Sequence, residues 1–313
     1  MKRGWLGILV AGVLLVATGA AVADPAKELR IGYQKYGTLT LLKARGTLDR
    51  QLAAEGVSVS WIEFPGGPQL LEALNVGSVD FGTTGEAPPV FAQAAGAPLL
   101  YVGYEPPSPL AEAILVPKDS PIHTVAELKG RTVALNKGSN VHYLLVRALE
   151  AAGLRYQDIQ PVYLPPADGR AAFERGAVDA WAIWDPYLAA AQQATGGRIL
   201  TDGSGLVSNH QFFLATRSYV RDNPTLIRET LEALRAVDEW AKASPRDVAE
   251  KLSPLINIPA ETVEVAVRRS NYGLRSLDPT TVTEQQKIAD TFQAIGLIPR
   301  KIVIQDVVWT PHP

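Results

Sequence analysis

Two distant stretches of the chain repeat one pattern, and this repeat limits the folds that the chain can adopt. LRIGYQKYGTLTLL (Leu29–Leu42) and GRTVALNKGSNVHYLL (Gly130–Leu145) each run from an apolar strand pattern, through a loop with lysine and glycine, into a helical pattern. Because each unit passes from strand to helix, the sequence predicts an α/β fold. We expect two lobes built on one plan, each a mostly parallel sheet with helices on both faces.

The second half of each unit also matches. A short helical pattern ends at Gly77 and again at Gly176, and both glycines are followed by x-Val-Asp and an apolar strand. A turn then opens another helix, at residues 84–88 and 184–186, with proline where an early helical position favours it. In such sheets, ligands bind beyond the carboxyl ends of the strands, where helix N-termini point. Two facing lobes would therefore direct several helix N-termini into one cleft.

The repeat also divides the chain into segments. Residues 24–112 are expected to form the first part of lobe 1, residues 113–211 lobe 2, and residues 212–313 the return to lobe 1 with C-terminal helices. The two strands that connect the lobes as a hinge are expected at residues 113–116 and 212–215. Further helical patterns, which should cover lobe 1, occupy residues 224–241, 246–252, 259–269 and 283–295.

The first residues have the pattern of a secretory signal peptide. Lys2 and Arg3 precede an apolar core, and Ala21-Val22-Ala23 fits the cleavage rule, so residues 1–23 are expected to be removed. The apolar core is shorter than the ~20 residues that a membrane span needs. The chain contains no cysteine, which excludes disulfides and a lipid attachment site, and the expected location is the periplasm.

The net charge of the chain limits the classes of partner that it can bind. Without Lys2 and Arg3, 28 basic residues remain against 32 acidic ones. An excess of negative charge argues against nucleic acid or an anionic membrane as the partner.

The second loop, Asn136–Asn140, lies where a strand becomes a helix, which is a favourable place for an anion. It is not a nucleotide loop, because Lys137 precedes the glycine instead of following it. Ser139 and His142 lie about one helical turn apart and lack the arrangement of a nucleophile and its base. With four histidines and no cysteine, metal-ligand spacings are missing. We therefore expect no catalytic residue, no metal and no cofactor.

The same region and its counterpart in the first unit are rich in neutral hydrogen-bond donors. Helix N-termini add about half a positive charge each, so a monovalent anion can be bound without burying a lysine or arginine. Turn or cap formation explains Ser139 and Thr84 equally well. The expected ligand-binding donors are Gln34, Thr83, Thr84, Ser139, Asn140 and the backbone N–H groups beside Gly85 and Gly138.

An aromatic and acidic group follows the second lobe's last strand. Trp184 is expected to form a wall of the cleft against an apolar ligand tail, whereas Trp181 is expected to be core. Asp185 is counted among the ligand-binding positions, although capping the next helix is its expected role. Glu86 would oppose a bound anion, so we expect it at the rim of the cleft, turned to solvent or a cation.

Four stretches, IGYQK, WIEFPGGPQLLEALNVGSVDFG, PPVFAQAAGAPLLYVGYEPP and DAWAIWDPY, resemble the aliphatic sulfonate-binding proteins of bacterial ABC importers. The likeness extends from Leu29 to Trp309. It implies a two-lobed type II periplasmic binding protein with two hinge strands, which acts as a monomer. Such a protein delivers an alkanesulfonate to a membrane permease with a cytoplasmic ATPase, for sulfur uptake.

The resemblance also implies site residues and leaves rivals open. Gln34, Thr84, Gly85, Ser139 and Trp184 match the family's ligand-contacting positions. Two departures, Asn140-Val141 in place of a serine-rich loop and glutamate at position 86, leave the preferred tail undecided. The alternatives are the same fold binding taurine, nitrate or a thiamine precursor, a periplasmic enzyme on this scaffold, and a ligand-sensing module.

Overall fold

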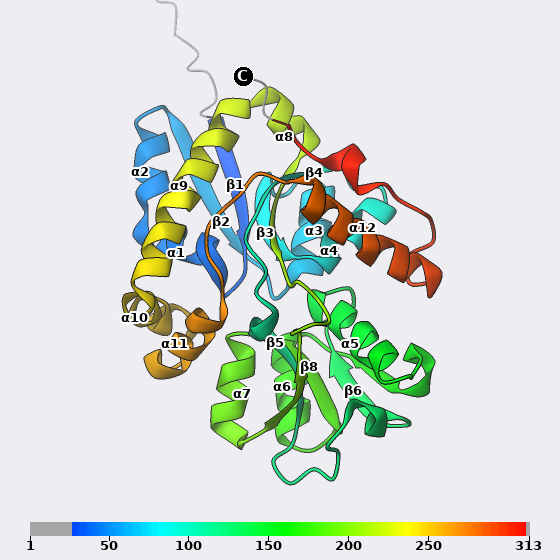
Figure 1. The fold of residues 1–313 in the computed structure, drawn as a ribbon. Coiled ribbons are helices and arrows are strands. Elements are labelled where there is room, and N and C mark those ends of the chain that lie inside the picture. Colours follow the sequence, from blue (N-terminus) through cyan, green and yellow to red (C-terminus); the bar gives the residue numbers. More distant parts are fainter. Residues whose placement is uncertain (1–26, 311–313) are drawn as a thin grey trace, which may run out of the picture.

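The computed structural model describes residues 27–310, and the expected signal peptide, residues 1–23, lies outside the described residues. The described chain forms two lobes, one above the other in Figure 1, each built on a five-stranded sheet. In the first sheet β1 pairs in parallel with β2 and β3, and β10 lies antiparallel between β3 and β4. Its strands, in spatial order, are β2 (Val57–Glu63), β1 (Lys27–Tyr33), β3 (Phe81–Gly85), β10 (Gln211–Thr216) and β4 (Leu99–Tyr104).

The second sheet repeats this order strand for strand. Here β6 pairs in parallel with β7 and β8, and β5 lies antiparallel between β8 and β9. The predicted α/β fold and its internal repeat are therefore confirmed, with one antiparallel strand in each sheet. The strands, in spatial order, are β7 (Gln160–Tyr163), β6 (Thr132–Leu135), β8 (Ala180–Trp184), β5 (Glu112–Val116) and β9 (Arg198–Asp202).

The chain crosses between the lobes twice, and the sequence misplaced both crossings. Residues 113–116 and 212–215, the expected hinge strands, lie inside the sheets as parts of β5 and β10. The crossings are residues 105–111 and 203–210, and a backbone bond of 3.0 Å joins Ser108 N to Ser208 O. The physical reason is that an apolar run marks a buried strand, whereas the polar crossings have no such pattern.

Helices cover both faces of each sheet (Figure 1). The first lobe carries α1 (Gly37–Arg45), α2 (Thr47–Ala53), α3 (Gly67–Asn75), α4 (Ala87–Ala94), α8 (Arg217–Asp222), α9 (Pro224–Ala243) and α12 (Pro279–Ala294). The second lobe carries α5 (Asn140–Ala151), α6 (Pro166–Glu174) and α7 (Tyr187–Thr195). The pair α10 (Pro245–Ile256) and α11 (Ala260–Arg269) lies beside both lobes, because α10 packs on α1 and α11 packs on α7.

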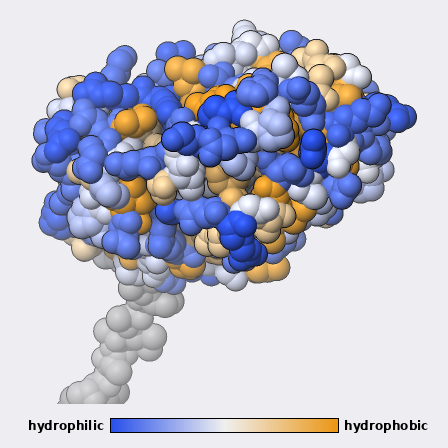
Figure 2. Space-filling view, turned by 90° about the horizontal axis from the view of Figure 1, so that it is seen from below, coloured by the Kyte–Doolittle hydropathy of each residue, from blue (hydrophilic) through white to orange (hydrophobic). Residues whose placement is uncertain are grey.

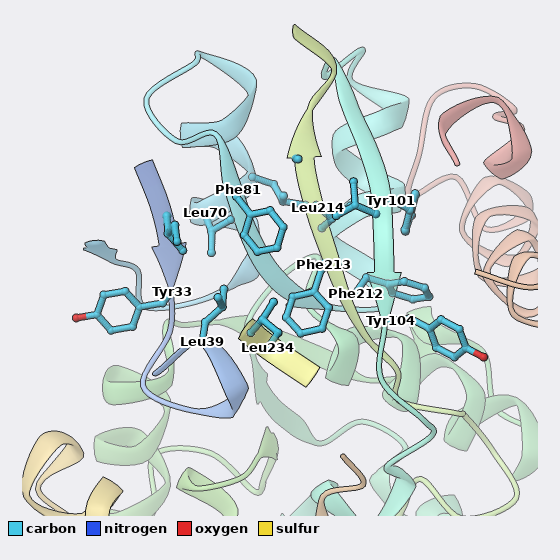
Figure 3. Close-up of a cluster of buried hydrophobic side chains, with 14 of the residues drawn as sticks. Tyr33, Leu39, Leu70, Phe81, Tyr101, Tyr104, Phe212, Phe213, Leu214 and Leu234 are labelled. Carbon is cyan, nitrogen blue, oxygen red and sulfur yellow. The ribbon is translucent and has the colours of Figure 1, made fainter. Parts of the chain in front are cut away.

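Each lobe has its own hydrophobic core. In the first lobe, aromatic and leucine side chains from β1, β3, β4 and β10 fill the space between sheet and helices, and the rings of Phe81 and Phe213 stack with centroids 6.1 Å apart (Figure 3). In the second lobe, Trp181 is 1 % exposed and packs on Phe173, which confirms its expected core position. Separate cores allow the lobes to move as units about the crossings.

The two aspartates of the repeated x-Val-Asp pattern have one structural role. Asp80 accepts from the backbone N and the guanidinium of Arg30 at 2.7–2.9 Å. Asp179 accepts from the backbone N and hydroxyl of Thr132 at 2.8 and 2.7 Å. Each carboxylate thus fixes a strand to the turn before its parallel neighbour, β1 to the turn before β3 and β6 to the turn before β8.

We expect Asp80→Ala to lower the free energy of unfolding by about 2 kcal/mol, because hydrogen bonds to a charged group are each worth ~1.5–3 kcal/mol. The matched Asp179→Ala should cost less, since that side chain is 35 % exposed against 6 % for Asp80, and water can replace the lost bonds. Urea unfolding of both variants measures the difference. Equal losses of unfolding free energy in the two variants would show that burial does not decide how much these hydrogen bonds contribute.

Within residues 27–310, no helix combines the length and the apolar character that a bilayer crossing requires. The face of the molecule in Figure 2 is mostly hydrophilic, with hydrophobic residues in small groups.

Candidate functional site

A cleft with an enclosed volume of about 60 Å³ lies between the lobes and α10–α11. The second lobe contributes the N-terminal residues of α5 and the turn before α7. The first lobe contributes the loop before α1 and the start of the first crossing. Its lining residues are Lys35, Tyr36, Gly37, Glu105, Ser108, Ala111, Asn140, Trp184, Asp185, Pro186, Asn209, Gln211, Leu252, Ile256, Val263, Ala266, Val267, Ser270 and Tyr272.

Three of the predicted ligand-binding residues line this cleft, and all come from the second lobe. Asn140 opens α5, Trp184 ends β8, and Asp185 follows it in the turn before α7. Trp184 is 5 % exposed, and its indole Nε1 has no hydrogen-bond partner among the described residues. A buried unpaired N–H costs ~1–3 kcal/mol, so this donor is suited to a ligand oxygen.

Asp185 lines the cleft and also supports the helix behind it. Its Oδ1 accepts from Ala189 N at 3.0 Å, and the guanidinium of Arg269 on α11 lies 3.3 Å from Oδ2. Burial raises the pKa of Asp185 to about 6, although Arg269 and the Ala189 bond act in the opposite direction. Pro186, not Asp185, is the N-cap residue of α7, but Asp185 accepts a first-turn N–H from the position before it and also ties α7 to α11.

The other predicted donors lie behind the cleft wall, where their polar groups already have partners. Gln34 Nε2 donates to Thr83 O at 3.1 Å, and Thr83 Oγ1 donates to Phe212 O at 3.1 Å. Thr84 Oγ1 donates to Gly85 O at 3.0 Å.

The second loop shows the same arrangement. Ser139 Oγ donates to Asn136 O at 2.7 Å, and Gly138 N donates to His142 Nδ1 at 3.1 Å. The structure therefore does not bring Gln34, Thr83, Thr84, Gly85, Gly138 or Ser139 to the cleft lining.

These loops meet each other because the lobes are closed. A Cβ on Gly85 would lie 2.9 Å from the side chain of Asn140, and one on Gly66 would lie 2.6 Å from Asn136 Nδ2. A Cβ on Gly138 would lie 3.5 Å from the ring of Phe91. Glycine thus stands at three places where a residue of one lobe touches the other.

His142 is packed in the interior and not solvated. Its side chain is fully buried, its ring stacks on Phe91 with centroids 6.2 Å apart, and burial lowers its pKa to about 4. It is therefore neutral at physiological pH.

Glu86 does not lie at the rim, so that expectation is wrong. The side chain is 1 % exposed, and its Oε2 accepts from His210 N at 3.1 Å. Burial raises its pKa to about 8, and the nearby charge of Glu284 acts in the same direction. Glu86 is therefore mostly protonated at neutral pH. In this form it carries no negative charge that would oppose a bound anion.

A second buried acid lies across the lobe boundary from Glu86. Glu112 of β5 is fully buried, contacts Asn140 Nδ2 through Oε2, and has a pKa held well above its usual range by burial and then by Glu86. Neither Oε1 of Glu86 nor that of Glu112 has a partner among the described residues. Asn140 Nδ2 also donates to Asn209 Oδ1 at 3.1 Å, so a polar chain runs from one acid to the other through the second crossing.

A third buried acid, Glu105, comes from the first lobe and lies in the cleft lining itself. Glu105 and Asp238 of α9 both contact the hydroxyl of Thr38, and Asp238 Oδ2 accepts from the backbone N of Gly273 and Leu274 at 3.1 and 2.7 Å. Burial and the neighbouring Asp238 raise the pKa of Glu105 well above its usual range. Glu105 therefore holds the proton, and Asp238, with its N–H donors, holds the negative charge.

The wall formed by α10 and α11 was not predicted from the sequence. These helices were expected to cover only lobe 1, but α11 packs on α7, and Arg269 Nη2 donates to Gln192 Oε1 at 2.8 Å. The amphipathic patterns indicated helices but not the partner of their apolar faces. The missed cleft residues include Tyr36, Glu105, Tyr272 and the apolar residues Leu252, Ile256, Val263, Ala266 and Val267.

The sequence and the fold of this chain are similar to those of known proteins. The NMT1/THI5-like family model matches residues 52–248. An aliphatic sulfonates-binding protein of Escherichia coli (strain K12) is 45 % identical over 312 residues, which cover 99 % of this chain and 97 % of that protein. The chain therefore belongs to the family of aliphatic sulfonate-binding proteins.

Two solved family members have the same fold. The alkanesulfonate-binding protein SsuA from Xanthomonas axonopodis pv. citri, bound to MOPS, is 42 % identical with a TM-score of 0.86, over 92 % of this chain and 99 % of that one. The periplasmic aliphatic sulphonate binding protein SsuA from Escherichia coli is 45 % identical with a TM-score of 0.82, over 92 % and 94 %. The agreement confirms the type II two-lobed fold for this member of the family.

Proposed function

We propose that this protein binds alkanesulfonates in the periplasm and delivers them to the permease of an ABC importer. The observation that carries the proposal is the near-full-length similarity to sulfonate-binding proteins of this kind. The cleft agrees with it, because the α5 N-terminus and an unpaired indole N–H suit a ligand rich in acceptor oxygens. This role is binding and delivery, without a chemical step.

The sulfonate is proposed to lie between Asn140 and Trp184, at the N-terminus of α5. Asp185 then supports the neighbouring turn through its hydrogen bond to α7 and its pair with Arg269. The predicted donors Thr84, Gly85, Gly138 and Ser139 shape this end of the cleft from behind, and Gln34 and Thr83 fix the turn before α4. The ligand tail extends towards the apolar wall of α10 and α11.

We expect butanesulfonate to bind at least tenfold more tightly than pentanoate. A sulfonate offers three acceptor oxygens and a carboxylate offers two, so the carboxylate leaves a buried donor unpaired, which costs ~1–3 kcal/mol. Calorimetry measures both ligands, and thermal unfolding provides a check, since ligand at ~100 times its dissociation constant adds about 2.7 kcal/mol. Taurine, nitrate and a thiamine precursor are measured in the same way, because they are the ligands of the alternative functions.

The variant Trp184→Phe tests the position of the site. It keeps an aromatic wall and removes the indole N–H together with part of the ring system, so butanesulfonate should bind about tenfold more weakly. Thermal unfolding of the ligand-free variant measures separately what the smaller ring costs the fold. Unchanged affinity would move the sulfonate away from Trp184. Tight binding of nitrate or a thiamine precursor, with no response to butanesulfonate, would refute the function itself.

A further inference from the structure

A second hollow lies on the other side of one wall of the cleft. Its volume is about 380 Å³, whereas the cleft encloses about 60 Å³. The cleft and this outer hollow share three lining residues, Val267, Ser270 and Tyr272. These residues therefore form a thin partition between the cleft, where the ligand tail is proposed to lie, and a larger space at the surface.

The partition is held in place by its backbone. On one side of Tyr272, the backbone N of Asn271 donates to Ser108 Oγ at 2.8 Å. On the other side, the backbone N of Gly273 donates to Asp238 Oδ2 at 3.1 Å. Because the chain is fixed on both sides of Tyr272, its ring can rotate or be replaced without the loss of these bonds.

The lining of the outer hollow is basic. It contains Lys242 of α9, Arg268 of α11 and Arg275, and no acidic residue of the described chain. Arg268 pairs with Glu264 at 2.5 Å, but within residues 27–310 no salt bridge reaches Lys242 or Arg275. A hollow lined by charges of one sign attracts the opposite charge, so this one favours an anion.

We propose that the outer hollow is a second subsite of the ligand, which binds the anionic end of a long sulfonate tail. The sulfonate lies at the N-terminus of α5, the alkyl chain passes Tyr272, and a terminal carboxylate or second sulfonate lies beside Lys242 and Arg275. The inference rests on the proposed function and extends it to the far end of the ligand. The acids of the cleft do not oppose such a ligand, because Glu105 is protonated and Asp185 forms a salt bridge.

The test compares ligands of one shape that differ in the charge of the tail end. In 8-sulfooctanoate and 8-sulfooctanamide the chain is the same, and a neutral amide replaces the terminal carboxylate. Calorimetry at low salt should show the carboxylate binding about threefold to tenfold more tightly, because ion pairs at exposed sites are individually weak. This preference should shrink in about 0.5 M salt, which screens exposed charges. The short pair 3-sulfopropanoate and 3-sulfopropanamide, whose tails end inside the cleft, should show no such preference.

The outcomes separate this inference from the proposed function. Equal or tighter binding of 8-sulfooctanamide, the same preference in the short pair, or binding of butanesulfonate without either long ligand would overturn the inference and leave the proposed function intact. Failure of all these ligands, butanesulfonate included, would refute the two proposals together.

Charge variants connect the preference to the outer hollow. Lys242→Gln and Arg275→Gln should each reduce the preference for 8-sulfooctanoate to about twofold or less, with the affinity for butanesulfonate unchanged. The matched control is Lys251→Gln on α10, an exposed lysine outside both linings, which should keep the preference of the parent protein. A preference unchanged in both Lys242→Gln and Arg275→Gln, or lowered equally by Lys251→Gln, would contradict the assignment.

Variants of Tyr272 test the partition itself. Tyr272→Ala removes the ring that crowds the passage, so both long ligands should gain about tenfold in affinity relative to butanesulfonate. The control Tyr272→Phe keeps the ring and should retain the ratio of the parent protein. Thermal unfolding verifies that each variant is folded. An unchanged ratio in Tyr272→Ala would show that the tail does not pass this residue.

Discussion

Replacing Gly85 with alanine is expected to weaken alkanesulfonate binding by about tenfold to hundredfold. The new Cβ would lie 2.9 Å from Cβ and Cγ of Asn140, closer than such atoms approach in proteins. Asn140 cannot yield easily, because its amide is bound to Glu112 and Asn209. Overpacking of this kind typically costs ~1–3 kcal/mol, and here the cost falls on closure of the lobes.

The fold itself should tolerate Gly85→Ala. The backbone of Gly85 is outside the left-handed region, so alanine can adopt it, and the clash disappears when the lobes separate. The control is Gly82→Ala on the same strand, where a Cβ would lie 2.7 Å from Leu70 within the first lobe. Calorimetry should show the loss of affinity for Gly85→Ala, and thermal unfolding the loss of stability for Gly82→Ala. Full affinity in Gly85→Ala would mean that ligand binding does not need this lobe contact.

Alkanesulfonate affinity is expected to fall by up to about hundredfold between pH 5.5 and 7.5. Closure buries Glu86 from the first lobe and Glu112 from the second in one polar chain, which favours their protonated forms. Burial raises the pKa of Glu86 from 4.5 to about 8, so its contribution is complete below 4.5 and is lost as pH rises through about 8. One proton taken up on closure corresponds to a tenfold change for each pH unit.

Calorimetry with butanesulfonate, which does not titrate, measures this dependence. Runs in two buffers of different ionisation enthalpy should show uptake of about one proton at pH 7. The titratable and charged groups around Glu86 are Glu112 of β5, Arg147 of α5, His210 of the second crossing, and Glu284 and Lys287 of α12. Glu86→Gln keeps a neutral group of the same shape and should flatten the pH dependence. The control Glu284→Gln should leave the pH dependence unchanged. If Glu284→Gln flattened the pH dependence and Glu86→Gln left it unchanged, the proton would be taken up by the His210–Glu284 pair instead of by Glu86.

The candidate site could be predicted only in part. Asn140, Trp184 and Asp185 follow strand ends at helix N-termini, and the repeat in the sequence was sufficient to direct them towards a cleft. Hydroxyl donors such as Thr84 and Ser139 have the same sequence signal, yet their bonds go to nearby carbonyl groups. A sequence pattern lists the donors but cannot tell which acceptor each one finds.

The sequence by itself determined the two lobes, the order of elements and the family, because hydrophobic periodicity and glycine positions are local properties of the chain. Tertiary structure decided which faces meet across the boundary between the lobes. It placed α11 against α7, Gly85 against Asn140, and the acids at positions 86, 105 and 112 in buried surroundings. The physical reason is that burial and electrostatic environment depend on residues distant in sequence, and a carboxyl group changes its protonation state when those residues exclude water.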